Sequence, residues 1–224
     1  MSLNIGVLGQ VLFSPKKAFE GIKDSTTMVD GIIMLVILSV LGSIIGMVIT
    51  MAVSGAIITT QGAALSMGNW VLSMVLDLVV GIIVLVAVGW LASVLAKSIG
   101  KGTGDMGKTV GLLGYSEIIN LIMGILASII IVAMAGSMVN AAISGNAGAA
   151  LGFVGVIGIL GIIGFIWMLY VGGSAVAVAN NTSLGAGIAS YFIASLIIGL
   201  IVVGVVFAAV FTMVGMAGPR MMGI

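Results

Sequence analysis

The chain has 224 residues, of which 62% are hydrophobic and only 6% are charged, and its formal net charge is +1. Soluble domains carry roughly 25% charged residues, so this composition excludes a soluble enzyme and a disordered chain. The net charge gives no support for a nucleic-acid partner. The sequence contains no His and no Cys, which removes imidazole bases, thiolate nucleophiles and the usual zinc ligands. We therefore expect an integral membrane protein that is not an enzyme and binds no metal or other cofactor.

The first segment, residues 1–30, is predicted to form an N-terminal interfacial helix on the cytoplasmic surface of the membrane. Ser14 followed by Pro15 is typical of a helix start, because Pro is well tolerated at the first helical position. From there an apolar face is formed by Ala18, Phe19 and Ile22. The charged residues that can reach lipid head groups are Lys16, Lys17, Glu20 and Lys23.

Five apolar runs follow, each long enough to cross a bilayer, which takes about 20 helical residues. Backbone groups cannot stay unpaired in lipid, and the alternating pattern of a membrane barrel is missing, so the spans are predicted to be helical. The predicted fold class is an all-α bundle of five transmembrane helices over residues 31–216, with an outside tail at 217–224. The predicted spans are about 31–54, 70–96, 109–136, 149–179 and 185–215.

The positive charges predict the orientation of the bundle, because Lys and Arg accumulate in cytoplasmic loops. Three lysines precede the first span, and Lys97, Lys101 and Lys108 form a basic loop between the second and third spans. Arg220 in the tail is the one cation on the other side. We therefore expect a cell-membrane protein with its N-terminus in the cytoplasm and its C-terminus outside.

Two carboxyl groups fall inside the predicted spans, Asp77 in the second and Glu117 in the third. Intramembrane ionisable groups are candidates for functional sites, although each is alternatively a protonated or hydrogen-bonded packing group. A rise of 1.5 Å per residue separates the two by about 15 Å in depth, which argues against a direct pair. Glu117 and Asn120 share a helix face, and with Gly114 and Tyr115 they form the predicted polar centre of the third span.

Glycines recur at three- and four-residue spacing in several spans, a pattern by which membrane helices approach one another closely. The most regular stripe lies in the fourth span and consists of Gly152, Gly155, Gly158, Gly161 and Gly164. Because three residues turn a helix by about 300°, this stripe drifts around the helix. We interpret these glycines as packing positions.

The segment Gly102-Thr-Gly-Asp105 matches the Gly-x-Gly-Asp signature of intramembrane aspartyl proteases. Two catalytic aspartates must lie close enough to share a proton. Asp105 is predicted in the cytoplasmic loop, whereas Asp77 is predicted in the outer half of its span. We therefore rank a protease function below the two hypotheses that follow.

Several short segments occur in a characteristic order along the chain. The run Phe-Ser-Pro-Lys-Lys-Ala-Phe-Glu-Gly-Ile, which ends at Ile22, precedes the first span, and glycine-rich residues 102–107 are followed by Gly114-Tyr115-Ser116. With five spans and a cytoplasmic N-terminus, this layout resembles the Yip domain family, whose eukaryotic members interact with Rab/Ypt GTPases. The sequence departs from the family in having no Pro shortly after Gly-Tyr and no long cytosolic N-terminal region. The resemblance implies a compact, prokaryotic-type five-helix core without catalytic activity.

The resemblance implies a non-enzymatic organiser or adaptor in membrane organisation or a trafficking-like process. Its expected partners are the lipid bilayer and either another membrane protein or a second copy of the chain. The alternative is a small permease or channel with Asp77 and Glu117 on the path of a substrate or proton. The two hypotheses differ in whether both carboxyl groups line one cavity.

Overall fold

The computed structural model describes residues 4–57, 67–144 and 147–217, and these ranges contain only helices and their connections. The short helices are η1 (Ile5–Val7), α1 (Leu8–Phe13), α2 (Pro15–Ile22) and α5 (Met106–Ser116). The long helices are α3 (Met28–Ile57), α4 (Met67–Gly100), α6 (Ile118–Ser144), α7 (Ala147–Ala179) and α8 (Leu184–Ala217). Residues 218–224 of the predicted tail, and with them Arg220, lie outside the described residues.

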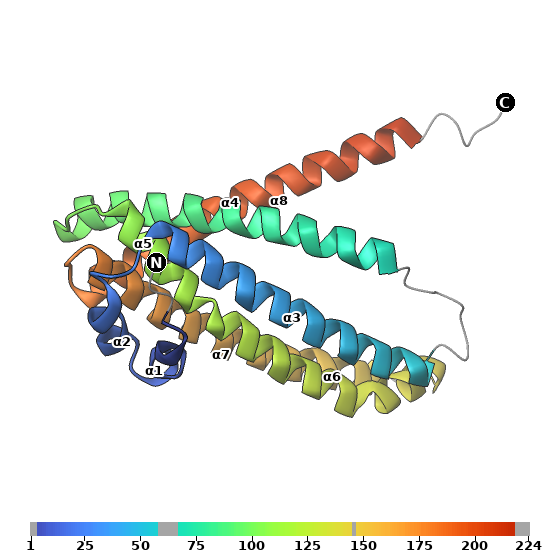
Figure 1. Ribbon diagram of the computed structural model, residues 1–224. Coiled ribbons are helices and arrows are strands. Elements are labelled where there is room, and N and C mark those ends of the chain that lie inside the picture. Colours follow the sequence, from blue (N-terminus) through green and yellow to red (C-terminus); the bar gives the residue numbers. More distant parts are fainter. Residues whose placement is uncertain (1–3, 58–66, 145–146, 218–224) are drawn as a thin grey trace.

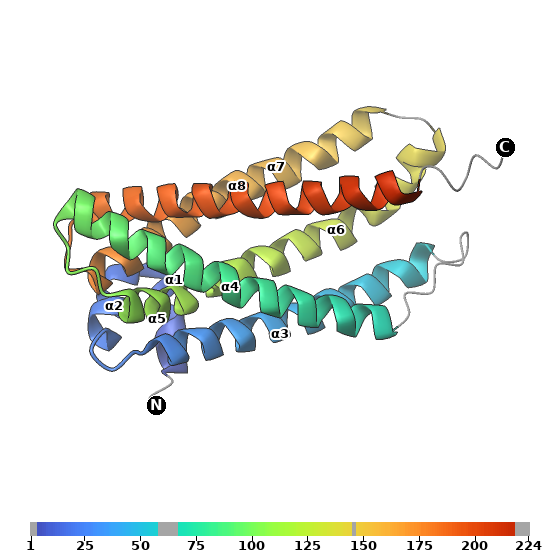
Figure 2. The ribbon, with the colours of Figure 1, turned by 90° about the horizontal axis from the view of Figure 1, so that it is seen from above.

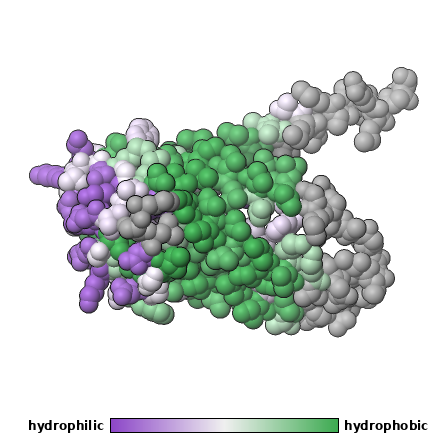
Figure 3. Space-filling view, in the orientation of Figure 1, coloured by the Kyte–Doolittle hydropathy of each residue, from purple (hydrophilic) through white to green (hydrophobic). Residues whose placement is uncertain are grey.

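Five helical segments are long and apolar enough to cross a membrane. They are Met28–Ile49, Trp70–Gly100, Met106–Met134, Val154–Ala179 and Leu184–Ala209. Large hydrophobic side chains cover the flanks of the bundle, and the hydrophilic residues gather at one end (Figure 3). The prediction of an all-helical membrane protein with five potential spans is confirmed.

The hydrophobic core of the bundle lies near this hydrophilic end. Here α3 packs against α5 and α6, while α8 packs against α7 and α4. The long helices spread apart toward the other end (Figures 1 and 2). The largest fully buried side chains include Phe19, Met34, Leu112, Tyr115 and Val176. Among the described residues, the buried core therefore lies mainly toward the hydrophilic end.

The third span is interrupted, which differs from the single helix predicted over residues 109–136. Helix α5 ends at Ser116, α6 begins at Ile118, and Glu117 lies in a turn between them. The Ser116 hydroxyl donates to the Leu112 carbonyl at 3.4 Å, a side-chain bond that competes with the helical backbone bonds. The interruption occurs without the proline that usually breaks a helix.

Helix α2 begins at Pro15, as the sequence predicts, but Ser14 forms no side-chain cap. The predicted apolar face is buried, since Ala18, Phe19 and Ile22 are at most 3% exposed. Helix α2 packs against α7. Its charged side chains are left facing outward at the hydrophilic end.

Glycines allow a close helix crossing between α3 and α5. A Cβ atom added at Gly114 would collide with the Gly31 carbonyl group, and one added at Gly31 would lie 2.6 Å from the Gly111 Cα. The packing interpretation therefore holds for these glycines. For the first four glycines of the α7 stripe, the interpretation as packing positions between helices of the same chain is wrong. Cβ atoms added at these positions have no neighbour within 4 Å: Gly152, Gly155, Gly158 and Gly161.

Candidate functional site: the polar end of the bundle

We call the hydrophilic end of the bundle the polar end (Figures 1 and 3). It consists of the N-terminal helices, three connections and the helix termini that these connections join: η1, α1, α2, residues 23–27, the α4–α5 loop (residues 101–105) and the α7–α8 turn (residues 180–183). Ten of the thirteen charged residues of the chain lie in these segments. They are Lys16, Lys17, Glu20, Lys23, Asp24, Asp30, Lys97, Lys101, Asp105 and Lys108. The polar end therefore holds all six lysines together, although they come from two distant parts of the sequence.

Asn180 fastens the α7–α8 turn to the rest of the polar end. Its side chain is fully buried, and its amide nitrogen donates to the Thr109 hydroxyl and to the Val176 carbonyl, each at 2.9 Å. Its backbone carbonyl accepts a hydrogen bond from the Thr103 N–H at 2.9 Å. The Thr182 hydroxyl adds a bond to the Gly100 carbonyl at 3.0 Å. Sequence reasoning missed this brace, for which the polar run Asn-Asn-Thr-Ser between two spans was the available signal.

Two aspartates at the polar end act as helix caps. Asp30 is fully buried, and its Oδ2 accepts from the Thr27 N–H at 2.9 Å and from the Thr27 hydroxyl at 2.7 Å. This is a capping box, whose Thr-x-x-Asp spacing ahead of an apolar run was a signal available in the sequence. Asp105 caps α5 by accepting from the Lys108 N–H at 3.0 Å. The Gly-x-Gly-Asp segment thus has a structural explanation as a turn and a helix start.

Two aromatic residues hold the N-terminal helices against the bundle. The Tyr115 hydroxyl accepts a hydrogen bond from the Asn4 N–H at 3.2 Å, and Tyr115 is fully buried. The indole N–H of Trp167 on α7 donates to the Leu12 carbonyl at 3.2 Å. The structure therefore places Tyr115 against the N-terminal segment, while the neighbouring Gly114 lies at the α3–α5 crossing.

Glu117 and Asn120 form a polar pair at the interruption of the third span. The Asn120 amide donates to Glu117 Oε2 at 2.6 Å. Tyr191 of α8 lies close to the Ser195 side chain and within electrostatic range of Glu117. Asp77 is exposed on α4. The described cavity is elsewhere, between α1–α2 and α7, and neither Asp77 nor Glu117 lines it.

The three lysines of the predicted basic loop have different surroundings. Lys108 forms an ion pair with Asp24 at 3.3 Å, which ties α5 to the segment between α2 and α3. Lys97 and Lys101 are exposed, and neither forms an ion pair with any described residue. In the described part of the chain, no three His, Cys, Asp or Glu side chains come together as a metal site would require.

One family model, described as Yip1 domain, matches residues 9–217, which include all five candidate spans. Neither the curated proteins nor the solved structures give a match.

Proposed function

Since the chain belongs to the Yip1 domain family, whose members are polytopic helical membrane proteins that are generally not catalytic, we propose that it is a non-enzymatic organiser or adaptor. In this role the bundle anchors the chain in the cell membrane, and the polar end faces the cytoplasm and binds another protein. The observation that carries the proposal is the polar end itself, in which segments distant in sequence are hydrogen-bonded into one surface.

Buried hydrogen bonds between segments stabilise one arrangement of the polar end. Buried polar groups are costly to leave unpaired, so a hydrogen bond such as that of Asn180 to Thr109 strongly favours one arrangement. A preformed surface loses less conformational freedom when a partner binds. The exposed Lys97 and Lys101 then present positive charge on this preformed surface, where an acidic partner can bind.

The proposed orientation follows from the same surface. All six lysines lie at the polar end, and cations are enriched on the cytoplasmic side of membrane proteins. A cytoplasmic polar end places the N-terminus inside the cell, and five spans then place the C-terminus outside.

Photocrosslinking in cells tests the adaptor proposal. A photoreactive residue in place of Lys101 is expected to give a discrete adduct with a second protein, because this position is exposed on the preformed surface. A matched probe in place of Leu200, which is exposed on the flank of α8, reports contacts within the bilayer. Absence of a protein adduct from probes at both Lys97 and Lys101 would contradict a partner at the polar end.

The second candidate function is a small permease or channel, and the interruption at Glu117 favours it. Helices broken at membrane depth supply binding sites in many transporters, because their free backbone groups can face a ligand. Glu117 and Asn120 place a carboxyl and an amide at this break. Against this candidate, the carboxyl group of Asp77 is exposed on another helix and does not line the described cavity.

Proton flux into reconstituted vesicles separates the two functions. The adaptor proposal predicts that vesicles with the protein hold a pH gradient as long as empty vesicles, as reported by an enclosed pH-sensitive dye. A permease or channel that conducts protons would dissipate the gradient, and Glu117→Gln would abolish that flux. The matched control Glu20→Gln, an exposed carboxyl at the polar end, would leave such a flux intact.

A further inference from the structure

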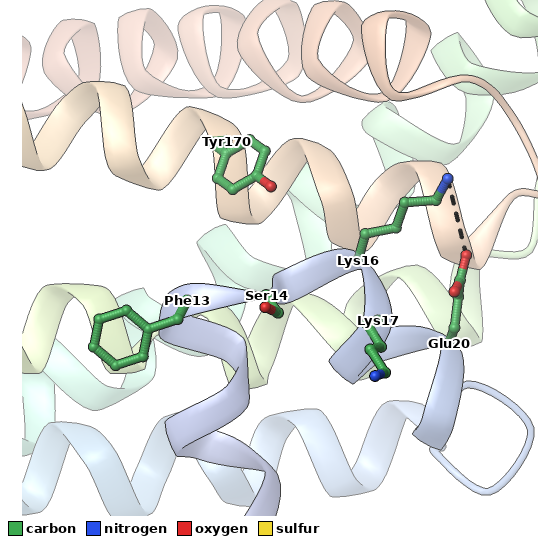
Figure 4. Close-up of a pocket in the computed structure, with 6 residues that line it drawn as sticks. All are labelled: Phe13, Ser14, Lys16, Lys17, Glu20 and Tyr170. Carbon is green, nitrogen blue, oxygen red and sulfur yellow. Dashed lines mark ion pairs between the residues drawn. The ribbon is translucent and has the colours of Figure 1, made fainter.

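A cavity of about 510 Å³ lies at the polar end, where the corner between α1 and α2 faces α7. Its lining residues are Phe13, Ser14, Lys16, Lys17, Glu20 and Tyr170. Figure 4 shows Phe13 at one end of this cavity, Lys16 and Glu20 at the other, and Ser14 and Tyr170 between them. The cavity therefore has an apolar end and a charged end.

The charged end has an excess of positive charge and little internal pairing. Two lysines, Lys16 and Lys17, line this end with a single carboxylate, that of Glu20. In Figure 4 the Lys16 side chain runs toward Glu20 and the Lys17 side chain points to another side. The Lys16 Nζ is 4.0 Å from Glu20 Oε1, with side chains 63% and 53% exposed. An ion pair this long and this exposed contributes little, so an incoming anion can replace the carboxylate as the partner of Lys16. Lys17 forms no ion pair with any described residue.

The apolar end of the cavity has an exposed phenyl ring, which is unfavourable in water but favourable at a membrane surface. Phe13 is 82% exposed, although it adjoins a well-packed helix corner. Tyr170 is 41% exposed on the same face of the bundle, and the nearby Trp167 is bonded to Leu12. Amphipathic rings such as those of Tyr170 and Trp167 collect at the level of lipid head groups. The phenyl ring of Phe13 is thus placed to contact acyl chains.

We propose that this cavity binds an anionic phospholipid from the leaflet at the polar end. The phosphate lies against Lys16, and Lys17 adds positive charge to the same lining. The Tyr170 and Ser14 residues line the same cavity, and the acyl chains run past Phe13. The proposal does not depend on a protein partner, so it stands or falls separately from the adaptor role. It commits to a lipid over a soluble phosphate because the lining joins cations to an exposed apolar ring.

Quenching of tryptophan fluorescence by brominated lipid tests this proposal on the full chain. The chain has three tryptophans, and the double variant Trp70→Phe/Trp90→Phe leaves Trp167, which adjoins the cavity through Leu12. The protein is reconstituted in phosphatidylcholine vesicles that contain brominated phosphatidylglycerol, or brominated phosphatidylcholine as the neutral comparison. The ratio of the two quenching constants gives the preference for the anionic lipid.

The expected result is a preference for phosphatidylglycerol that Lys16→Gln/Lys17→Gln lowers roughly tenfold to thirtyfold, in line with the attraction of two surface cations to anionic lipid. The matched control Lys97→Gln/Lys101→Gln removes the same charge from the polar end outside the cavity and is expected to keep the preference. All four side chains lie at the exposed polar end, so both variants should fold, which circular dichroism verifies.

Three results would overturn the proposal. The first is a wild-type protein that shows no preference for phosphatidylglycerol. The second is an equal loss in both double variants, which would mean a general surface potential. The third is full displacement of the lipid by soluble glycerol phosphate, which would make the site a phosphate site.

Phe13→Ser is expected to weaken quenching by both lipids, because this change removes the contact with acyl chains.

Discussion

Replacing Gly114 with Ala is expected to destabilise the protein by about 3 kcal/mol, the upper range for overpacking a core. The added Cβ would collide with the Gly31 carbonyl group, which is backbone and cannot rotate away. Helices α3 and α5 must then move apart, although both are packed into the core at the polar end. Thermal or denaturant unfolding of the purified protein in detergent measures the loss.

The chain supplies a matched control for this change. Gly158→Ala makes the same substitution in α7, at a position where a Cβ atom has no neighbour within 4 Å. It is expected to leave the unfolding midpoint unchanged or slightly higher, because Ala favours a helix over Gly. Equal destabilisation by the two substitutions would show that the close α3–α5 crossing is not the cause.

Replacing Asn180 with Ala is expected to cost about 2 kcal/mol of unfolding free energy and to loosen the polar end. The change removes two side-chain hydrogen bonds and leaves the Thr109 hydroxyl with only the bond that it donates to the Asp105 carbonyl. Part of this cost is offset, because the buried Asn180 Oδ1 has no partner among the described residues and its removal relieves a desolvation penalty. Faster hydrogen exchange at residues 101–105 would report the loosened loop.

The neighbouring residue is the control for this second prediction. Asn181 is exposed and has a φ of 52°, a left-handed conformation that Gly adopts readily. Asn181→Gly removes the exposed hydrogen bond that the Asn181 Oδ1 accepts from the Lys23 Nζ at 3.2 Å. It is expected to change stability by less than about 0.5 kcal/mol, as usual for surface substitutions. If Asn180→Ala behaved like Asn181→Gly, the proposed brace between the α7–α8 turn and the α4–α5 loop would be wrong.

The sequence alone determined the membrane class, the five spans and the buried face of α2. These features depend on local hydropathy and helical periodicity, so a window of neighbouring residues contains the information. Ala18, Phe19 and Ile22 are buried as predicted because helical spacing alone puts them on one side of α2. The capping box at Thr27 is equally local and was readable in the sequence, although it was missed.

Only the tertiary structure decided which polar and small residues are paired. Gly114 and Gly158 both occur in apolar runs, and the sequence does not distinguish them. In the structure, Gly114 lies against the Gly31 backbone carbonyl, whereas a Cβ atom added at Gly158 has no neighbour within 4 Å. Asn180 and Thr109 meet across 71 residues, and the cavity at Phe13 exists only because α2 packs against α7. The physical reason is that the hydropathy of a segment determines whether it is stable in the bilayer as a helix. Which helices it packs against depends on close packing and polar contacts between segments distant in sequence.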